Sequence, residues 1–194
     1  MRRGFRSGIL LAFGLTLSLF ISEKSFCKQV VVAVTQLVAH PAVDAVREGI
    51  KESLKAEGYI EGDNMRFVFA NAHGNIATAN QIAQKFAGMS PDVIVAITTP
   101  SAQSFMSFIK NSNIPLIFAG VTNPISGRLV KDMNHPGGNV TGTSDKPKIP
   151  EQIGLIRKIL RKDGLITVGV VYNSGEANSV EQVQAAKIEA TRNN

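Results

Sequence analysis

The sequence predicts an α/β fold in which a parallel, doubly wound sheet is followed by the incomplete start of a second α/β lobe. Short runs of apolar and β-branched residues alternate four times with stretches of helical periodicity, and short turns separate them. This alternation is typical of parallel strands joined by right-handed helical crossovers, which cover both faces of the sheet. One further apolar run and one further helix follow, at 165–172 and 179–191. We therefore expect a first lobe at 28–145 and, at 146–194, a crossing segment with part of a second lobe.

The first two strand–helix units are recognised by their composition. The β-branched run at 29–35 predicts a buried strand, and Pro41 opens a helix that ends near Gly58. A second strand is expected at 65–70, and a second helix follows it at 76–88. The apolar residues of the two helices recur at helical spacing: Val43, Val46, Ile50 and Leu54 in the first, and Ile76, Ala79, Ala83 and Phe86 in the second.

The third unit contains the turn that is the best candidate for a binding site. An apolar run at 93–97 breaks at T-T-P-S, where Thr99 suits the N-cap position and Pro100 the first helical position. The amides left unpaired at the positive end of the helix dipole would be those of Ser101, Ala102 and Gln103. Such a turn can bind a carboxylate or a phosphate. The alternative is that Thr99 only caps a structural helix.

Three loops follow the strands at the same edge of the predicted sheet. The fourth strand is expected at 116–119, and ligands of parallel sheets bind outside the carboxyl ends of the strands. The loops at 36–40, 98–101 and 120–123 are therefore available to meet, which makes Thr122 a ligand candidate. His40 stands at the mouth of the predicted cleft, where ligand contact and plain helix capping are equally compatible with its position.

The remainder of the chain predicts an exit from the first lobe. Helix breakers are dense at 133–139, a short run follows at 140–143, and a crossover is expected at 145–150. A fifth strand is expected at 165–172, after a helix whose apolar stripe consists of Ile149, Ile153, Ile156 and Leu160. Because a lone strand–helix unit cannot bury both faces of its strand, we expect the sequence to be truncated at its C-terminal end.

The first 27 residues are interpreted as a signal peptide. Three arginines precede an apolar run at 9–21, and the small residues Ser25 and Cys27 suit cleavage before Lys28. The apolar run is too short to span a bilayer comfortably. We therefore expect an exported, periplasmic protein. Cys27, the only cysteine, leaves lipid anchoring as an alternative, although the residues before it differ from the usual lipoprotein pattern.

Composition excludes several classes of function. The formal net charge is +6, but residues 1–27 carry +3 of it, and no basic stripe with interleaved aromatic residues indicates nucleic-acid binding. The sequence contains no phosphate-binding glycine loop and no nucleophile elbow, and its three histidines are scattered. We expect a binding protein without a metal, a cofactor or catalytic residues.

Six stretches occur in the same order in a known family. They are H-P-A-V-D-A-V-R-E-G-I at 40–50, A-N-A-H-G-N-I-A-T-A-N-Q-I-A-Q-K-F at 70–86, V-A-I-T-T-P-S-A-Q at 95–103, V-T-N-P at 121–124, H-P-G-G-N-V-T-G at 135–142 and V-V-Y-N-S-G-E-A-N-S at 170–179. Together they resemble the ABC-transporter substrate-binding proteins of the tryptophan/tyrosine-binding type.

The resemblance implies a type I periplasmic-binding-protein fold, whose two lobes close about a hinge on a small ligand, commonly an aromatic amino acid. The partners it implies are an ABC permease and its ATPase. It implies that Asp145 lies at the first hinge crossing. The first-lobe carboxylate cradle would be Thr99, Ser101 and Ala102, and the matching turn of the second lobe would be Glu176, Ala177, Asn178 and Ser179.

This sequence departs from the family in length, because family chains continue well past position 194 with further second-lobe strands. We therefore expect weak ligand binding by this chain alone. Two alternatives to transport remain: a flavodoxin-like enzyme that holds a phosphate cofactor at 98–101, and an exported sensor lobe that acts by protein contact.

Overall fold

The computed structural model describes residues 28–192 and contains one five-stranded, fully parallel sheet. The strand order is β2-β1-β3-β4-β5. The strands are β1 (Val30–Gln36), β2 (Met65–Asn71), β3 (Val93–Ile97), β4 (Leu116–Val121) and β5 (Val140–Ser144). The helices are α1 (Pro41–Ala56), α2 (Ile76–Gly88), α3 (Thr99–Ile109), α4 (Ile149–Leu160) and α5 (Ala177–Arg192). The predicted parallel, doubly wound α/β fold is confirmed.

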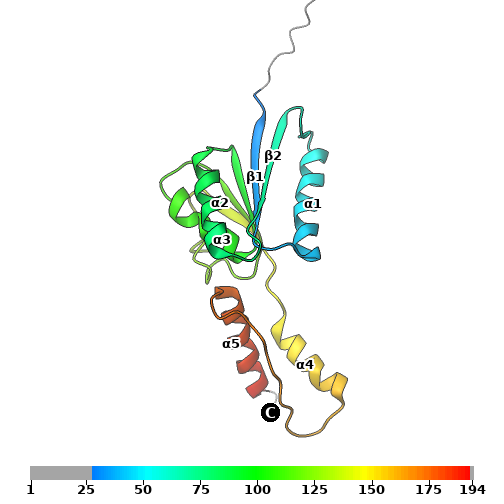
Figure 1. Ribbon diagram of the computed structural model, residues 1–194. Helices are drawn as coiled ribbons and strands as arrows, with labels where there is room; N and C mark the ends of the chain where they lie inside the picture. The colour runs from blue at the N-terminus through cyan, green and yellow to red at the C-terminus, as the bar shows by residue number, and fades with distance from the viewer. Residues whose placement is uncertain (1–27, 193–194) are drawn as a thin grey trace, which may run out of the picture.

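Helices cover both faces of the sheet, with α1 on one side and α2 and α3 on the other (Figure 1). Alternate residues of β1 point to opposite faces, so Ala33 joins the core under α2 and α3, whereas Val32 and Val34 face α1. Under α2 and α3, the rings of Phe86 and Phe105 pack with their centroids 6.4 Å apart. The larger of the two core clusters therefore lies on the α2–α3 side of the sheet.

The short run at 140–143, which the sequence placed at the exit from the lobe, forms the edge strand β5 beside β4. Its close approach to β4 requires glycine at position 142. A Cβ atom there would lie 1.9 Å from the Phe118 carbonyl oxygen, and the φ angle of Gly142 is +157°. The chain leaves the sheet at Asp145, whose amide donates to the Val121 carbonyl at 3.1 Å.

The C-terminal segment, defined as residues 149–192, lies beyond the sheet (Figure 1). The strand predicted at 165–172 is wrong, because these residues form no ladder with any strand of the described chain. Their apolar side chains face solvent: Leu165 is 82% exposed and Val171 fully exposed. A strand is stabilised by pairing on its edges, and this stretch has no neighbour to pair with. The last helix also begins two residues earlier than predicted, at Ala177.

Within the described part of the chain, no helix combines the length and the hydrophobicity needed to cross a membrane. The predicted signal peptide at 1–27 and the alternative of a lipid anchor at Cys27 both lie outside the described residues.

Candidate functional site

The turn between β3 and α3 is built differently from the sequence prediction in one respect. The N-cap of α3 is Thr98, not Thr99, and its backbone has φ +80° and ψ +157°. Positive φ is an outlier for a β-branched residue, and such strain is concentrated at functional sites. The Thr98 side chain forms no capping hydrogen bond, so its hydroxyl is not used by the helix itself.

The shift of the cap by one residue also changes which amides are free. The Ala102 amide donates to the Thr98 carbonyl at 3.2 Å, so the prediction that it is free is wrong. Gln103 is the fifth residue of α3, where the amide belongs to the regular helical hydrogen-bond pattern, so its amide is not among the free ones either. The first turn of α3 consists of Thr99, Pro100 and Ser101, and proline has no N–H. The amides at the positive end of α3 are therefore those of Thr99 and Ser101.

Four buried side-chain oxygens of the described residues have no hydrogen-bond partner: Thr98 Oγ1, Thr99 Oγ1, Ser101 Oγ and Asn178 Oδ1. Three belong to the start of α3, where Thr99 is 2% and Ser101 1% exposed, and the fourth belongs to the first turn of α5. Leaving such a group unsatisfied costs about 1–3 kcal/mol. Their concentration at two helix N-termini makes this region the candidate functional site.

The two helix N-termini belong to elements that touch. Helices α3 and α5 are in contact, and the start of α5 lies close to the sheet lobe (Figure 1). The loop after β4 joins them, since Gln182 Nε2 donates to Thr122 Oγ1 at 3.5 Å. On its other side, this loop packs against α3: a Cβ atom on Gly127 would lie 3.3 Å from Thr99 Cγ2. The structure thus assembles the site from α3, the loop after β4 and α5.

The predicted site residues divide into two groups. The first group lies on the elements that meet, and it consists of Thr99, Ser101, Ala102, Thr122, Ala177, Asn178 and Ser179. The second group is engaged elsewhere. His40 is exposed and caps α1, because its Nδ1 accepts from the Ala42 amide at 3.2 Å. The carboxylate of Glu176 accepts from Asn173 Nδ2 at 2.9 Å within its own turn. Asp145, which was predicted at the hinge crossing and not in the ligand site, is exposed just after β5.

Sequence reasoning missed four residues of the assembled site. Thr98 was placed in the turn but not among the ligand candidates, and only its buried, partnerless hydroxyl singles it out. Asn123 and Ser126 bind Glu181, which lies more than fifty positions away in the chain. No local pattern marks a pair at that separation, so only the tertiary structure reveals it.

The site has helix dipoles rather than clustered charges. The N-terminus of α3, where the amides of Thr99 and Ser101 are free, presents partial positive charge and favours a carboxylate. Among residues 28–192, no group of three His, Cys, Asp or Glu side chains is arranged to hold a metal ion.

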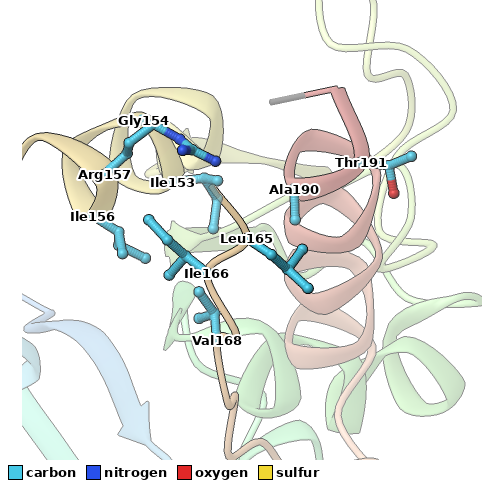
Figure 2. Close-up of a pocket in the computed structure, with 9 residues that line it drawn as sticks. All are labelled: Ile153, Gly154, Ile156, Arg157, Leu165, Ile166, Val168, Ala190 and Thr191. Atoms are coloured by element: carbon cyan, nitrogen blue, oxygen red, sulfur yellow. The ribbon is translucent and has the colours of Figure 1, made fainter. Parts of the chain in front are cut away.

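A separate apolar hollow of about 200 Å³ lies in the C-terminal segment. Figure 2 shows that α4, the extended stretch after it and the last turn of α5 line this hollow, through side chains such as Ile153, Leu165 and Ala190. Asn178 stands at the opposite end of α5, so the hollow is distinct from the site above.

A sequence profile described as "ABC transporter substrate binding protein" matches residues 31–194. The chain is 40% identical, over 167 residues, to a "Tyrosine-binding protein" of Clostridioides difficile (strain R20291). That match covers 86% of this chain and 47% of the relative.

Three solved structures are similar to the chain. A conserved domain protein of Vibrio cholerae has a TM-score of 0.81 at 45% identity, with 86% of this chain and 55% of that chain covered. A Streptococcus pneumoniae ABC domain in complex with L-Trp has a TM-score of 0.78 at 35% identity, with 85% and 54% covered. A ligand-free, open substrate binding protein with adhesive properties from Clostridium difficile has a TM-score of 0.65 at 40% identity, with 84% and 54% covered.

This chain therefore spans about half the length of the relatives that it matches. The profile match covers most of the chain, and the sheet topology agrees with a periplasmic-binding-protein lobe. The chain belongs to the family of ABC transporter substrate binding proteins.

Proposed function

We propose that the chain is the extracytoplasmic solute-binding component of an ABC importer, and that its ligand is an amino acid held between the N-termini of α3 and α5. The observation that carries this proposal is the set of four buried side-chain oxygens without partners at these two termini. The free amides and the three hydroxyls at the start of α3 supply donors, and Asn178 Oδ1 supplies an acceptor. A zwitterionic amino acid needs both.

The chemistry of the two halves of an amino acid fits the two kinds of group. A ligand carboxylate would accept from the Thr99 and Ser101 amides and from the threonine and serine hydroxyls, at the positive end of α3. A ligand ammonium would donate to Asn178 Oδ1, which lacks a donor of its own. The relatives named for tyrosine binding and solved with L-Trp favour an aromatic side chain.

The wider setting follows from family membership. We propose that residues 1–27 direct export, that the mature chain is periplasmic, and that it delivers ligand to an ABC permease driven by a separate ATPase. Residues 28–145 would form the first lobe, Asp145 the first hinge crossing, and residues 146–194 the start of the second lobe. Family membership favours binding over the flavodoxin-like enzyme alternative, because the matched relatives are named for solute binding.

We further propose that this 194-residue chain binds its ligand more weakly than the longer relatives. The C-terminal segment contributes α5 to the site, but its extended stretch is unpaired and exposes large apolar side chains such as Leu165. A segment that lacks its own core holds α5 less firmly, and a site that is poorly positioned loses affinity.

The substitution Thr99→Val tests the site, because valine keeps the shape of threonine and removes only the hydroxyl. We expect the free protein to gain stability, by about 1 kcal/mol, since a partnerless buried oxygen disappears. We expect L-tryptophan and L-tyrosine binding to weaken by roughly tenfold, which corresponds to about 1.4 kcal/mol. Urea unfolding measures the first effect and isothermal titration calorimetry the second.

The matched control is Thr143→Val, which alters an exposed threonine at the edge strand away from α3. It should change neither the stability of the free protein nor its affinity for L-tryptophan and L-tyrosine. Unchanged affinity in Thr99→Val, in a chain that binds the amino acids, would contradict the proposed site.

A further inference from the structure

Glu181 connects two parts of the chain that are far apart in sequence. It lies in the second turn of α5, and its Oε1 accepts from Asn123 Nδ2 at 2.6 Å. Its Oε2 accepts from the Ser126 hydroxyl. Both oxygens of one carboxylate are therefore used on a single loop, the one that follows β4. Charge-assisted bonds of this kind are stronger than neutral ones.

The loop presents its two donors in a fixed geometry. Asn123 Oδ1 accepts from the amides of Ile125 and Ser126, at 3.0 and 3.2 Å, which closes the loop into a turn. Gln103 Nε2, on α3, donates to the Gly127 carbonyl at 3.1 Å and ties the end of that turn to the lobe. The donors that meet Glu181 are thus part of the rigid lobe, whereas Glu181 belongs to the C-terminal segment.

The backbone as a whole is more similar to one of these relatives than to the other. The TM-score is 0.78 for the complex with L-Trp, at 35% identity, and 0.65 for the ligand-free, open structure, at 40% identity. The higher score accompanies the lower identity, so the ranking does not follow sequence similarity. Over the matched residues, the chain as described is therefore more similar to the L-Trp complex than to the ligand-free, open structure.

We propose that Glu181 acts as an interlobe clasp, which holds the first turn of α5 against the loop after β4 and thereby positions Asn178 toward the start of α3 before ligand arrives. Glu181 is a positioning residue and not a ligand contact. Its effect on affinity rests on the proposed function, whereas the clasp itself is measurable without any ligand.

Distances between spin labels test the clasp directly. Cys27 is the only cysteine, so residues 28–194 accept two introduced cysteines without competition. The exposed positions Ser107 on α3 and Lys187 on α5 suit the labels. Pulsed electron–electron double resonance measures the distance between the two labels. In Glu181→Ala, this distance should be longer, and its distribution broader, than in the parent. Glu181→Gln should stay near the parent, because its amide oxygen still accepts from Asn123.

Two further variants keep this test decisive. Ser126→Ala removes one hydrogen bond from the loop side and should broaden the distance distribution less than Glu181→Ala. The double variant Ser126→Ala/Glu181→Ala should differ little from Glu181→Ala, because both changes break the same contact. Gln184→Ala, at an exposed position on α5, is the control and should match the parent. A distribution in Glu181→Ala that superimposes on the parent would overturn the clasp.

The ligand measurement separates the clasp from the proposed function. If the parent binds L-tryptophan, Glu181→Ala should weaken binding by roughly three- to tenfold, the range that corresponds to the net contribution of one ordinary hydrogen bond, because Glu181 acts on the pocket only through the position of α5. If the parent does not bind it, the proposed function fails while the distance measurement still decides the clasp. A circular-dichroism melt of each variant confirms that the sheet lobe remains folded.

Discussion

Strand β3 and the extended stretch at 165–172 have similar sequences, V-I-V-A-I against L-I-T-V-G-V-V-Y, and each precedes a helix. In β3 every residue after the first is buried, because β1 and β4 pair with its two edges and helices cover both faces. In the other stretch no strand of the described chain pairs with it, and most of its side chains face solvent. The comparison shows that an apolar, β-branched run forms a strand only where other strands pair with its edges and helices cover its faces.

The same contrast extends to the helices. Helix α3 buries most of its length, including Phe105 and Ile109, whereas α4 buries no residue and α5 only Val183. The sheet lobe thus has a core of its own, and the C-terminal segment does not. We expect stability to reside in the lobe, and the part of the site on α5 to depend on contacts with it.

The largest effect should come from a core residue in the lobe. Phe105→Ala removes a fully buried ring that packs against Phe86, and we expect it to lower the free energy of unfolding by about 3–5 kcal/mol. Leu165→Ala, in the C-terminal segment, removes a side chain that is 82% exposed and should stay within about 0.5 kcal/mol of the parent. Urea unfolding of both variants checks the contrast, and equal losses would refute it.

A smaller effect is expected from adding a methyl group to a glycine in each region. Gly142→Ala places a Cβ atom against the Phe118 carbonyl and should cost about 1–3 kcal/mol as β5 moves away from β4. Gly169→Ala meets nothing within 4 Å and should be close to neutral. Hydrogen exchange of the β4 amides measures the local effect. Unchanged protection in Gly142→Ala would show that β5 does not pack as described.

The smallest effect concerns acid sensitivity. The hydrogen bond from the Val31 amide, at 2.8 Å, lowers the pKa of the Asp92 carboxyl below its usual value, and the Lys28 ammonium 3.7 Å away adds to this. A lowered pKa in the folded state means that Asp92 stabilises the fold above the unfolded pKa of about 3.9, and that this stabilisation is lost as the pH falls through the folded pKa.

As the pH is lowered from 5 to the acid transition, the melting temperature of Asp92→Asn should therefore fall less than that of the parent. Thermal melts at a series of pH values measure this difference. Asp163→Asn changes an exposed carboxylate in the C-terminal segment and serves as the control, with no change expected. A parent and an Asp92→Asn variant with parallel pH profiles would contradict the assignment.

Hydrophobic periodicity correctly predicted the first three strand–helix units and the fourth strand, because their apolar residues face the core. The fourfold alternation is wrong in its last step, because no helix of the described chain lies between β4 and β5. Periodicity did not reveal β5, since T-G-T-S is polar and its pairing comes from β4. It wrongly predicted a strand at 165–172, because the apolar pattern of a segment does not show whether another strand lies beside it.

The site was predictable in part. The T-T-P-S turn identified Thr99 and Ser101, which are buried at the start of α3. The position of the cap was wrong by one residue, because Thr98 adopts a positive φ that propensity does not assign to threonine. His40 could be read equally as a cap or as a ligand residue, and the structure shows the cap. The Glu181 contacts needed the tertiary structure.

An NMR titration of residues 28–194 with L-tryptophan, up to roughly 10 mM and therefore able to detect millimolar affinity, tests the central claim most directly. If the partnerless oxygens at the two helix N-termini form the site, the largest amide shifts fall at Thr99, Ser101 and Asn178. Shifts centred on Ile153, Leu165 and Ala190, around the apolar hollow of Figure 2, or no shifts at all, would contradict it.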